Sequence, residues 1–376
     1  ARKIGEGKEK EAREDFSLLA LSCFLFTTAL VALCFLFLKP LCRFLGSDDA
    51  LMPYCIDYMI PVLLTMPLAV FGMIWQMSYI TVGHAHLGLI FSVLGGVINI
   101  VLDWIFIAKM NMGIWGASIA TGIGYALPSV IGLVLFSVHR DRVLYIVKPK
   151  WRWKTLWQSC VNGSSEMVSV LAFSTVTILF NNILMNLAGS DGVASLTIIW
   201  YAQGLFSGMF RGYITGIASV VSYNLGRGIK KRLKKLFTIS IYTILGASVV
   251  VTAISYMFGG SVVSVFAKGN RMVYETALHG FHIVAVSFFM MAYNVFSSGW
   301  FTALNDGKTS AILSFCRTVI FMVFPVLILP RFFETDGVWL SLAVGEGLSL
   351  IMTVYYFIKY KSVWTPDKEE NTTAQT

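Results

Sequence analysis

Charged residues are scarce in this chain. Only 13% of its 376 residues are Asp, Glu, Lys or Arg, whereas soluble globular proteins contain about 25%. Hydrophobic residues make up 56% of the chain, and the mean hydropathy is +0.72. So little polar surface cannot cover a globule in water, and the composition therefore excludes an ordinary soluble protein.

The usual signatures of catalysis and of metal binding are also absent. The sequence contains no H-E-x-x-H motif, no G-x-S-x-G motif and no S-x-x-K motif with supporting partners, so hydrolytic chemistry has no visible machinery. The six cysteines form no C-x-x-C pair and lie mostly inside apolar stretches, which indicates packing rather than metal binding. We predict that the chain is not an enzyme and holds no metal; a membrane-embedded enzyme remains the less favoured alternative.

Long apolar runs are abundant. Stretches such as Phe16–Leu38 and Leu236–Phe258 exceed the roughly 18 residues that a spanning helix requires. The stretch VLGGVINIVLDWIFI lacks the alternation of polar and apolar residues that is typical of a membrane β-barrel. We therefore predict an all-α polytopic membrane protein with spans near residues 16–38, 53–82, 86–108, 113–137, 157–187, 193–222, 237–258, 274–303, 310–329 and 337–359.

Basic residues gather in loops that should lie on one side of the membrane. Most of the 29 Lys and Arg residues fall in the opening segment 1–13, the loop 140–154, the run 227–235 and the chain end. Basic loops remain in the cytoplasm, so both chain ends are predicted to be cytoplasmic and the membrane to be the plasma membrane. This effect accounts for the net charge of +9 with lipid headgroups as the partner and no nucleic acid.

The chain contains an internal repeat. Three matches follow one another at an offset of 221 to 224 residues: Ile4–Gly7 with Leu225–Gly228, Gly83 with Gly307, and Gly113–Trp115 with Gly337–Trp339. A duplication of this kind predicts two pseudo-symmetric helical bundles. We predict an incomplete N-lobe at 1–146, a cytoplasmic loop at 147–156, a C-lobe at 157–362 and a cytoplasmic tail at 363–376.

The two halves of the repeat are unequal in length. The spans 157–187 and 193–222 precede the second-half match, and no equivalent spans precede the first. We therefore expect a complete protein with twelve helices, of which this chain holds ten. Repeats of even helix number place a substrate site between the lobes, where it is exposed alternately to each side.

Several segments occur in a characteristic order: IGEGKEKEA, NIVLDWIFI, NGSSEM, FNNILMNLAGSDGVASL, SYNLGRG, FTALNDGKTSAILSFCRT and DGVWLSLAVGE. In this order they resemble the multidrug and toxic compound extrusion (MATE) family, bacterial type, over nearly the whole chain. The resemblance implies a monomeric antiporter in which Na⁺ or H⁺ enters while an amphipathic, often cationic, molecule leaves. It implies no cofactor besides the coupling ion.

A lipid-linked oligosaccharide flippase of the same superfamily is the alternative function. Its cavity should hold several basic residues facing a pyrophosphate. The predicted spans contain only two bases, Arg211 and Arg317. This count favours a cationic substrate.

Acids inside the predicted spans are the first candidates for a functional site, because a buried charge is costly in a bilayer. A carboxylate can hold a proton, a sodium ion or a cationic substrate, which suits antiport. Glu166, in NGSSEM, matches an acid of similar sequences, but it could instead be a solvated acid at the cytoplasmic mouth. Glu346 replaces Gly122 of the other lobe, and could instead pair structurally with Arg317 or Arg211. Asp103, in VLDWIFI, is a further candidate, but a structural role in capping or pairing at the membrane interface is favoured for it.

The remaining candidates are Arg317, Asn181, Asn182, Tyr293 and Asn294. Arg317 could neutralise an acid of its lobe or line the cavity. The amides could ligate sodium or contact substrate, but hydrogen bonding between helices accounts for them equally well. The many aromatic and methionine side chains suit a cavity for flat amphipathic cations.

Overall fold

The computed structural model describes residues 1–44, 47, 49–138, 143–267 and 269–366, and within these ranges it contains helices and no strand. Residues 140–142 of the basic loop and 367–376 of the predicted tail lie outside the described residues. Contacts divide the chain into two units, Lys3–Leu156 (unit 1) and Trp157–Thr376 (unit 2), and each is described by itself.

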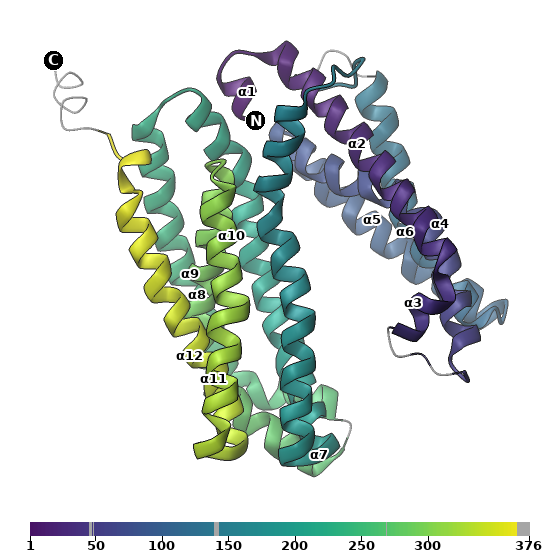
Figure 1. Ribbon diagram of the computed structural model, residues 1–376, viewed down its shortest axis with the longest axis vertical. Helices are drawn as coiled ribbons and strands as arrows, with labels where there is room; N and C mark the ends of the chain where they lie inside the picture. Colours follow the sequence, from purple (N-terminus) through teal and green to yellow (C-terminus); the bar gives the residue numbers. More distant parts are fainter. Residues whose placement is uncertain (45–46, 48, 139–142, 268, 367–376) are drawn as a thin grey trace. The chain divides into compact units, whose positions relative to one another are not determined.

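The described residues form nine helices that are long and apolar enough to span a membrane (Figure 1). In unit 1 they are α2 (Glu9–Leu36), α4 (Met52–Thr81), α5 (Ala85–Asp103) continued by the π-helix η1 (Trp104–Lys109), and α6 (Gly113–Val138). Unit 2 contains α7 (Trp153–Gly226), α8 (Lys230–Ala267), α9 (Arg271–Ala303), the broken helix α10–η2–α11 (Gly307–Phe315, Cys316–Ile320, Phe321–Ile328) and α12 (Pro330–Lys359). Short helices α1 (Arg2–Gly5), α3 (Leu38–Phe44) and η3 (Lys361–Val363) complete the set. The predicted all-helical fold is confirmed.

Helix α7 is long because it joins two of the predicted spans. Its 74 residues leave helical geometry only at Gly189, where φ is 62° and ψ is −154°. The two limbs fold back on each other, since the Trp200 ring lies 5.3 Å from Phe173 and 5.8 Å from Phe180. The predicted break at 188–192 was therefore too wide: one glycine, which tolerates positive φ, makes the reversal.

The repeat is visible in the turns. Gly7 and Gly228 both have positive φ, 76° and 69°. In each turn the glycine amide donates to the carbonyl three residues earlier, at 3.0 Å, and the next amide donates to the carbonyl five residues earlier. Gly83 closes a third turn in the same way, and its structural counterpart is Asn305 (φ 62°) rather than Gly307.

Unit 1 is held together by close contacts around α4. The Trp75 ring stacks on Phe71 at 5.3 Å and on Phe136 at 5.1 Å, and its Nε1 donates to the Ser129 carbonyl at 2.9 Å. Glycines let helices approach closely: a Cβ on Gly95 of α5 would lie 2.6 Å from the carbonyl oxygen of Gly124 in α6.

Unit 2 is built around α9, which packs against α8, α10 and α12 (Figure 1). Its Phe281, Phe288 and Trp300 side chains are fully buried. Trp364, after the end of α12, is also buried and contacts the Phe237 ring at 5.0 Å. The segment after α12 is therefore tied to the core of the unit.

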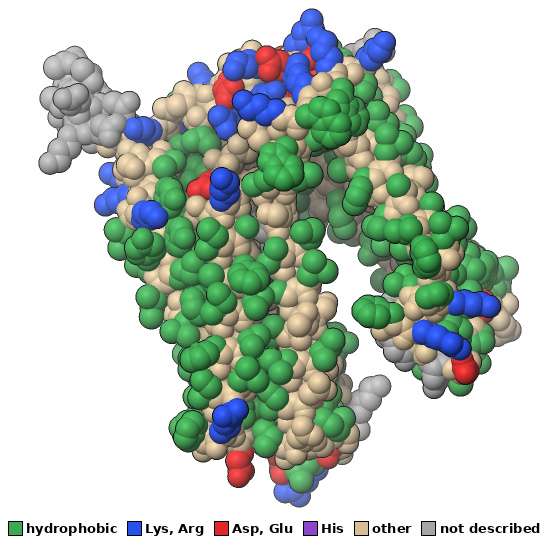
Figure 2. All heavy atoms as spheres, in the orientation of Figure 1, with side chains coloured by type: hydrophobic (Ala, Val, Ile, Leu, Met, Phe, Trp, Pro, Cys, Tyr) green, Lys and Arg blue, Asp and Glu red, His purple; other side chains and the backbone are tan. Residues whose placement is uncertain are grey.

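Hydrophobic side chains cover the outer surfaces of the helices, while Lys and Arg gather at helix ends (Figure 2). Leu36, Met257 and Ile358 are 70–78% exposed. Such a surface is stable against lipid tails and not against water. The long helices thus form a multi-pass membrane protein.

Candidate functional site

A buried acid and a partly exposed base form an ion pair in unit 2. Glu346 on α12 is 0% exposed. Arg317 on η2 donates from Nη2 to Glu346 Oε1 at 2.7 Å and from Nε to both carboxylate oxygens at 3.1 Å. Removing a carboxylate from water is unfavourable unless such a partner compensates its charge. Of the two structural partners expected for Glu346, the structure selects Arg317.

Asn294 on α9 completes the coordination of the carboxylate. Its Nδ2 donates to Glu346 Oε2 at 2.7 Å and to the Glu346 carbonyl at 2.9 Å. Its Oδ1 accepts a hydrogen bond from Thr353 at 2.9 Å, and the Ser297 hydroxyl lies 3.0 Å from that of Thr353. We call Glu346, Arg317, Asn294, Ser297 and Thr353 the Glu346 cluster.

Local helix geometry brings Arg317 to this place. The π-helical segment η2, Cys316–Ile320, interrupts the α-helix between α10 and α11, and one extra residue per turn changes the direction of the side chains that follow. Helix α12 lies close to this segment because Gly345 has no side chain: a Cβ there would be 2.4 Å from the Phe321 carbonyl oxygen. Glu346, the next residue, is thereby held within reach of Arg317.

The cluster offers oxygen atoms to a cation. The Glu346 carboxylate, Asn294 Oδ1 and the hydroxyls of Ser297 and Thr353 are hard donors, which suit cations such as sodium. In this structure the carboxylate forms an ion pair with Arg317. A proton or a sodium ion on Glu346 would therefore compete with Arg317 for the same oxygen atoms.

Glu166 is not part of this cluster. It is exposed on the first limb of α7 and makes no hydrogen bond or ion pair within the described residues. Asn162, one turn earlier, lies against the turn after α9, since a Cβ on Gly307 would be 2.4 Å from the Asn162 Cα. Glu166 is thus about 6 Å along the helix from that turn, close to the end of unit 2.

Asp103 is the predicted acid in unit 1, at the junction of α5 and η1. It makes no side-chain capping hydrogen bond there. Its Oδ1 atom is buried without a hydrogen-bond partner among the described residues. Neither the expected cap nor an expected pair is therefore present at this atom.

The remaining predicted residues lie apart from one another. Asn181 is half-buried and Asn182 is exposed on α7, and neither side chain forms a hydrogen bond within the described part of the chain. Tyr293 is half-buried next to Asn294, and its ring lies 5.6 Å from Phe289. Of the eight predicted residues, the structure brings together Glu346, Arg317 and Asn294.

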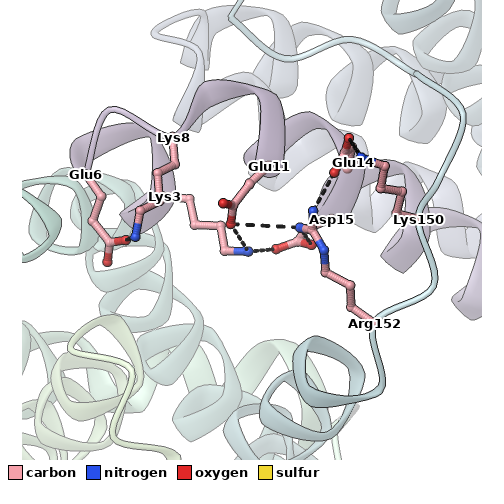
Figure 3. A network of polar contacts seen from close by, with 8 residues as sticks. All are labelled: Lys3, Glu6, Lys8, Glu11, Glu14, Asp15, Lys150 and Arg152. Atoms are coloured by element: carbon pink, nitrogen blue, oxygen red, sulfur yellow. Dashed lines mark hydrogen bonds and ion pairs between the residues drawn. The ribbon is translucent and has the colours of Figure 1, made fainter.

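Unit 1 contains a second charged network (Figure 3). None of its residues was among the candidates predicted from the sequence. Glu14 and Asp15, at the start of α2, are only 6% and 7% exposed. Arg152 bonds to both acids, with 2.9 Å between its Nη1 and Asp15 Oδ1, and Lys150 Nζ lies 3.0 Å from Glu14 Oε1.

This network fixes the segment after α6 onto α2. Arg13 Nε donates to the Val143 carbonyl at 2.9 Å, and the Val147 amide donates to the Ser17 hydroxyl at 2.9 Å. The one feature of the sequence that points to this network is the run EKEAREDF, which contains four of the 20 acids of the chain. Arg152 lies 137 and 138 positions from the two acids that it binds, and no sequence spacing indicates such a pairing.

A cavity of about 590 Å³ opens at the other end of unit 1. Apolar and aromatic side chains line it, among them Tyr54, Tyr58, Met59 and Ile114. It contains none of the predicted site residues, and its walls suit the ring of an amphipathic molecule rather than a charge.

A buried acid paired with a base among membrane-spanning helices is typical of a membrane transporter. The sequence profile of the MatE family matches residues 1–105 and 166–327. The chain therefore belongs to the MatE family, whose members are transporters and not enzymes.

Individual relatives agree with this assignment. The chain is 21% identical over 333 residues to the multidrug export protein MepA of Staphylococcus haemolyticus. The aligned region covers 88% of this chain and 73% of that protein. It is 21% identical over 364 residues to an FAD transporter of Shewanella oneidensis, covering 94% and 79%. The fold is similar to the outward-facing structure of a multidrug resistance MATE family transporter, with a TM-score of 0.90, 21% identity and coverage of 97% and 82%.

Proposed function

We propose that the protein exports amphipathic, cationic organic molecules in exchange for inward movement of Na⁺ or H⁺, and that the Glu346 cluster is the coupling site of unit 2. The observation that carries this proposal is the fully buried Glu346 carboxylate, held by Arg317 and Asn294. The similarity to a multidrug export protein supports the substrate class.

The coupling step exchanges one positive partner of Glu346 for another. While Arg317 is bound, η2 and α12 are joined by the ion pair. A proton or sodium ion on Glu346 releases Arg317, which weakens this contact and favours a second arrangement of the helices. An ion drives such a change only through different affinities for the two arrangements, and the loss of Arg317 from the carboxylate supplies that difference.

The orientation follows from the basic segments. Lys and Arg are concentrated near the start of α2, in the segment after α6 and at the start of α8. Basic segments are retained in the cytoplasm. We therefore place these ends, and both ends of the chain, on the cytoplasmic side of the plasma membrane.

Ethidium uptake into everted membrane vesicles, under an imposed sodium or proton gradient, tests the proposal. Glu346→Gln should abolish gradient-driven uptake, because a neutral amide neither forms an ion pair with Arg317 nor exchanges a cation. Glu275→Gln is the control, since that acid forms an exposed pair with Arg271 at the start of α9. Full coupling in Glu346→Gln at normal expression would refute the assignment, and Glu166→Gln and Asp103→Asn show whether a second acid contributes.

Export of an anionic amphipathic molecule is the second candidate. One relative is named an FAD transporter, and Arg211 is exposed within the second limb of α7 without a partner among the described residues. An oligosaccharide flippase has no comparable support. Uptake of FAD into the same vesicles, lost in Arg211→Gln while ethidium uptake persists, would favour the anionic substrate.

A further inference from the structure

A groove at the basic end of α8 has the features of a binding site. Its volume is about 310 Å³, and its walls are Lys231, Lys234, Lys235, Thr238, Ile239 and Pro366. Three lysines and one threonine therefore line a space that is large enough for a phosphate with its substituents.

The three lysines are not neutralised by the described part of the protein. Lys231, Lys234 and Lys235 are exposed and form no ion pair or hydrogen bond there. The bases of unit 1 are arranged differently, since Arg152 and Lys150 are paired with Glu14 and Asp15 (Figure 3). The groove thus retains positive charge that an anion can compensate.

Pro366, in the wall of the groove, is tied to the folded core. Pro366 follows Trp364 by two residues, and Trp364 is only 1% exposed. Its ring lies 5.0 Å from Phe237 on α8 and 5.9 Å from Trp300 on α9. The position of Pro366 beside α8 is therefore set by core packing.

The groove continues into an apolar stripe on the same face of α8. Ile239 belongs to both, and it is followed by Tyr242, Leu245 and Val249, which are 49%, 69%, 38% and 52% exposed in this order. These residues are three or four positions apart, so they share one face of the helix. The opposite face, with Leu233, Ser240, Ile244 and Ser248, is buried.

We propose that this groove binds the headgroup phosphate of an anionic phospholipid, with the acyl chains lying along the apolar stripe. Basic pockets beside membrane helices bind such headgroups. A free phosphate would use the lysines but not the stripe, and the continuity of the two favours the lipid. The site is independent of the proposed transport reaction and contains none of its residues.

Native mass spectrometry of the purified protein tests this site with palmitoyl-oleoyl phosphatidylglycerol and the matching phosphatidylcholine as probes. The wild-type protein should retain phosphatidylglycerol in preference. Replacing Lys231, Lys234 and Lys235 together by Gln should lower its retention about tenfold or more, because each base near an anionic headgroup contributes to its binding. These side chains are exposed, so the variant should keep its thermal unfolding midpoint.

The control is Gln at Lys148, Lys154 and Lys308, which are exposed bases outside the groove. It removes the same charge and should leave retention unchanged; equal loss in the control would overturn the proposal. Ile239→Asn should weaken retention of the lipid, and an unchanged affinity would contradict the role of the stripe. Displacement of the lipid by equimolar glycerol phosphate would show a free-anion site and also overturn it.

The acids that follow Pro366 in the sequence provide a further test. Asp367, Glu369 and Glu370 can be replaced together by the corresponding amides. We expect phosphatidylglycerol retention to be unchanged. Binding that appears only in this variant would mean that the chain's own acids fill the groove, and the lipid site would be refuted.

Discussion

The two units carry very different residues at equivalent positions of the repeat, and these positions make different contacts. Gly122 in α6 and Glu346 in α12 lie equally far from Gly113 and Gly337, the matched glycines of the repeat. In unit 1 a Cβ on Gly122 would be 2.8 Å from Thr65 of α4, so the helices touch there. In unit 2 the same position holds a carboxylate bonded to α9 and η2.

The partner of Glu346 has a counterpart as well. Arg317 stands as far beyond the Asn305 turn as Gly95 stands beyond the Gly83 turn. Gly95 lies against the Gly124 carbonyl of α6. Unit 1 therefore packs α5 against α6 by van der Waals contact, whereas unit 2 joins η2 and α12 by a charged pair.

The largest effect should come from breaking the charged pair. Arg317→Ala leaves the Glu346 carboxylate buried without its cation, and we expect a loss of about 3–5 kcal/mol of stability. The fall in the thermal unfolding midpoint of the purified protein measures it. The double variant Arg317→Leu, Glu346→Leu removes both charges and should be more stable than Arg317→Ala. A double variant that is equally unstable would show that packing, and not charge, holds this contact.

An intermediate effect is expected in unit 1 from Gly95→Ala. The added methyl group would lie 2.6 Å from the Gly124 carbonyl oxygen, and because backbone cannot rotate away, α5 and α6 must separate at a cost of about 1–3 kcal/mol. Gly96 is the matched control, since a Cβ there meets nothing within 4 Å. Gly96→Ala should leave the unfolding midpoint unchanged or raise it. Equal midpoints for the two variants would contradict the close packing of unit 1.

The smallest effect on stability is expected at a second pair of equivalent positions in the two units. Thr353 and Ser129 are equivalent in the repeat, but Thr353 donates to Asn294 of another helix, whereas Ser129 donates to Tyr125 of its own. Thr353→Val should cost about 0.6–1.5 kcal/mol, and Ser129→Ala should cost less. Parallel unfolding curves measure the difference, and the reverse order would show that Thr353 does not support the cluster.

Much of the candidate site could be predicted, because buried charges are rare in membrane helices. Glu346, Arg317 and Asn294 stood out as polar residues in apolar segments, and a Glu346–Arg317 pair was one of two pairings considered. Glu166 and Asp103 stood out for the same reason, yet they lie outside the cluster. Glu14 and Asp15 were missed because they precede the apolar part of α2, where acids are common and need no partner.

The order of apolar runs and of the turns between them determined the helices of this protein, since each depends only on neighbouring residues and on their transfer into lipid. Tertiary structure decided which polar groups meet. The choice of Arg317 over Arg211 required a π-helical turn at η2 and the close approach of α12 at Gly345. Such contacts depend on how distant helices pack, and a distance of a few ångströms separates a bonded carboxylate from an isolated one.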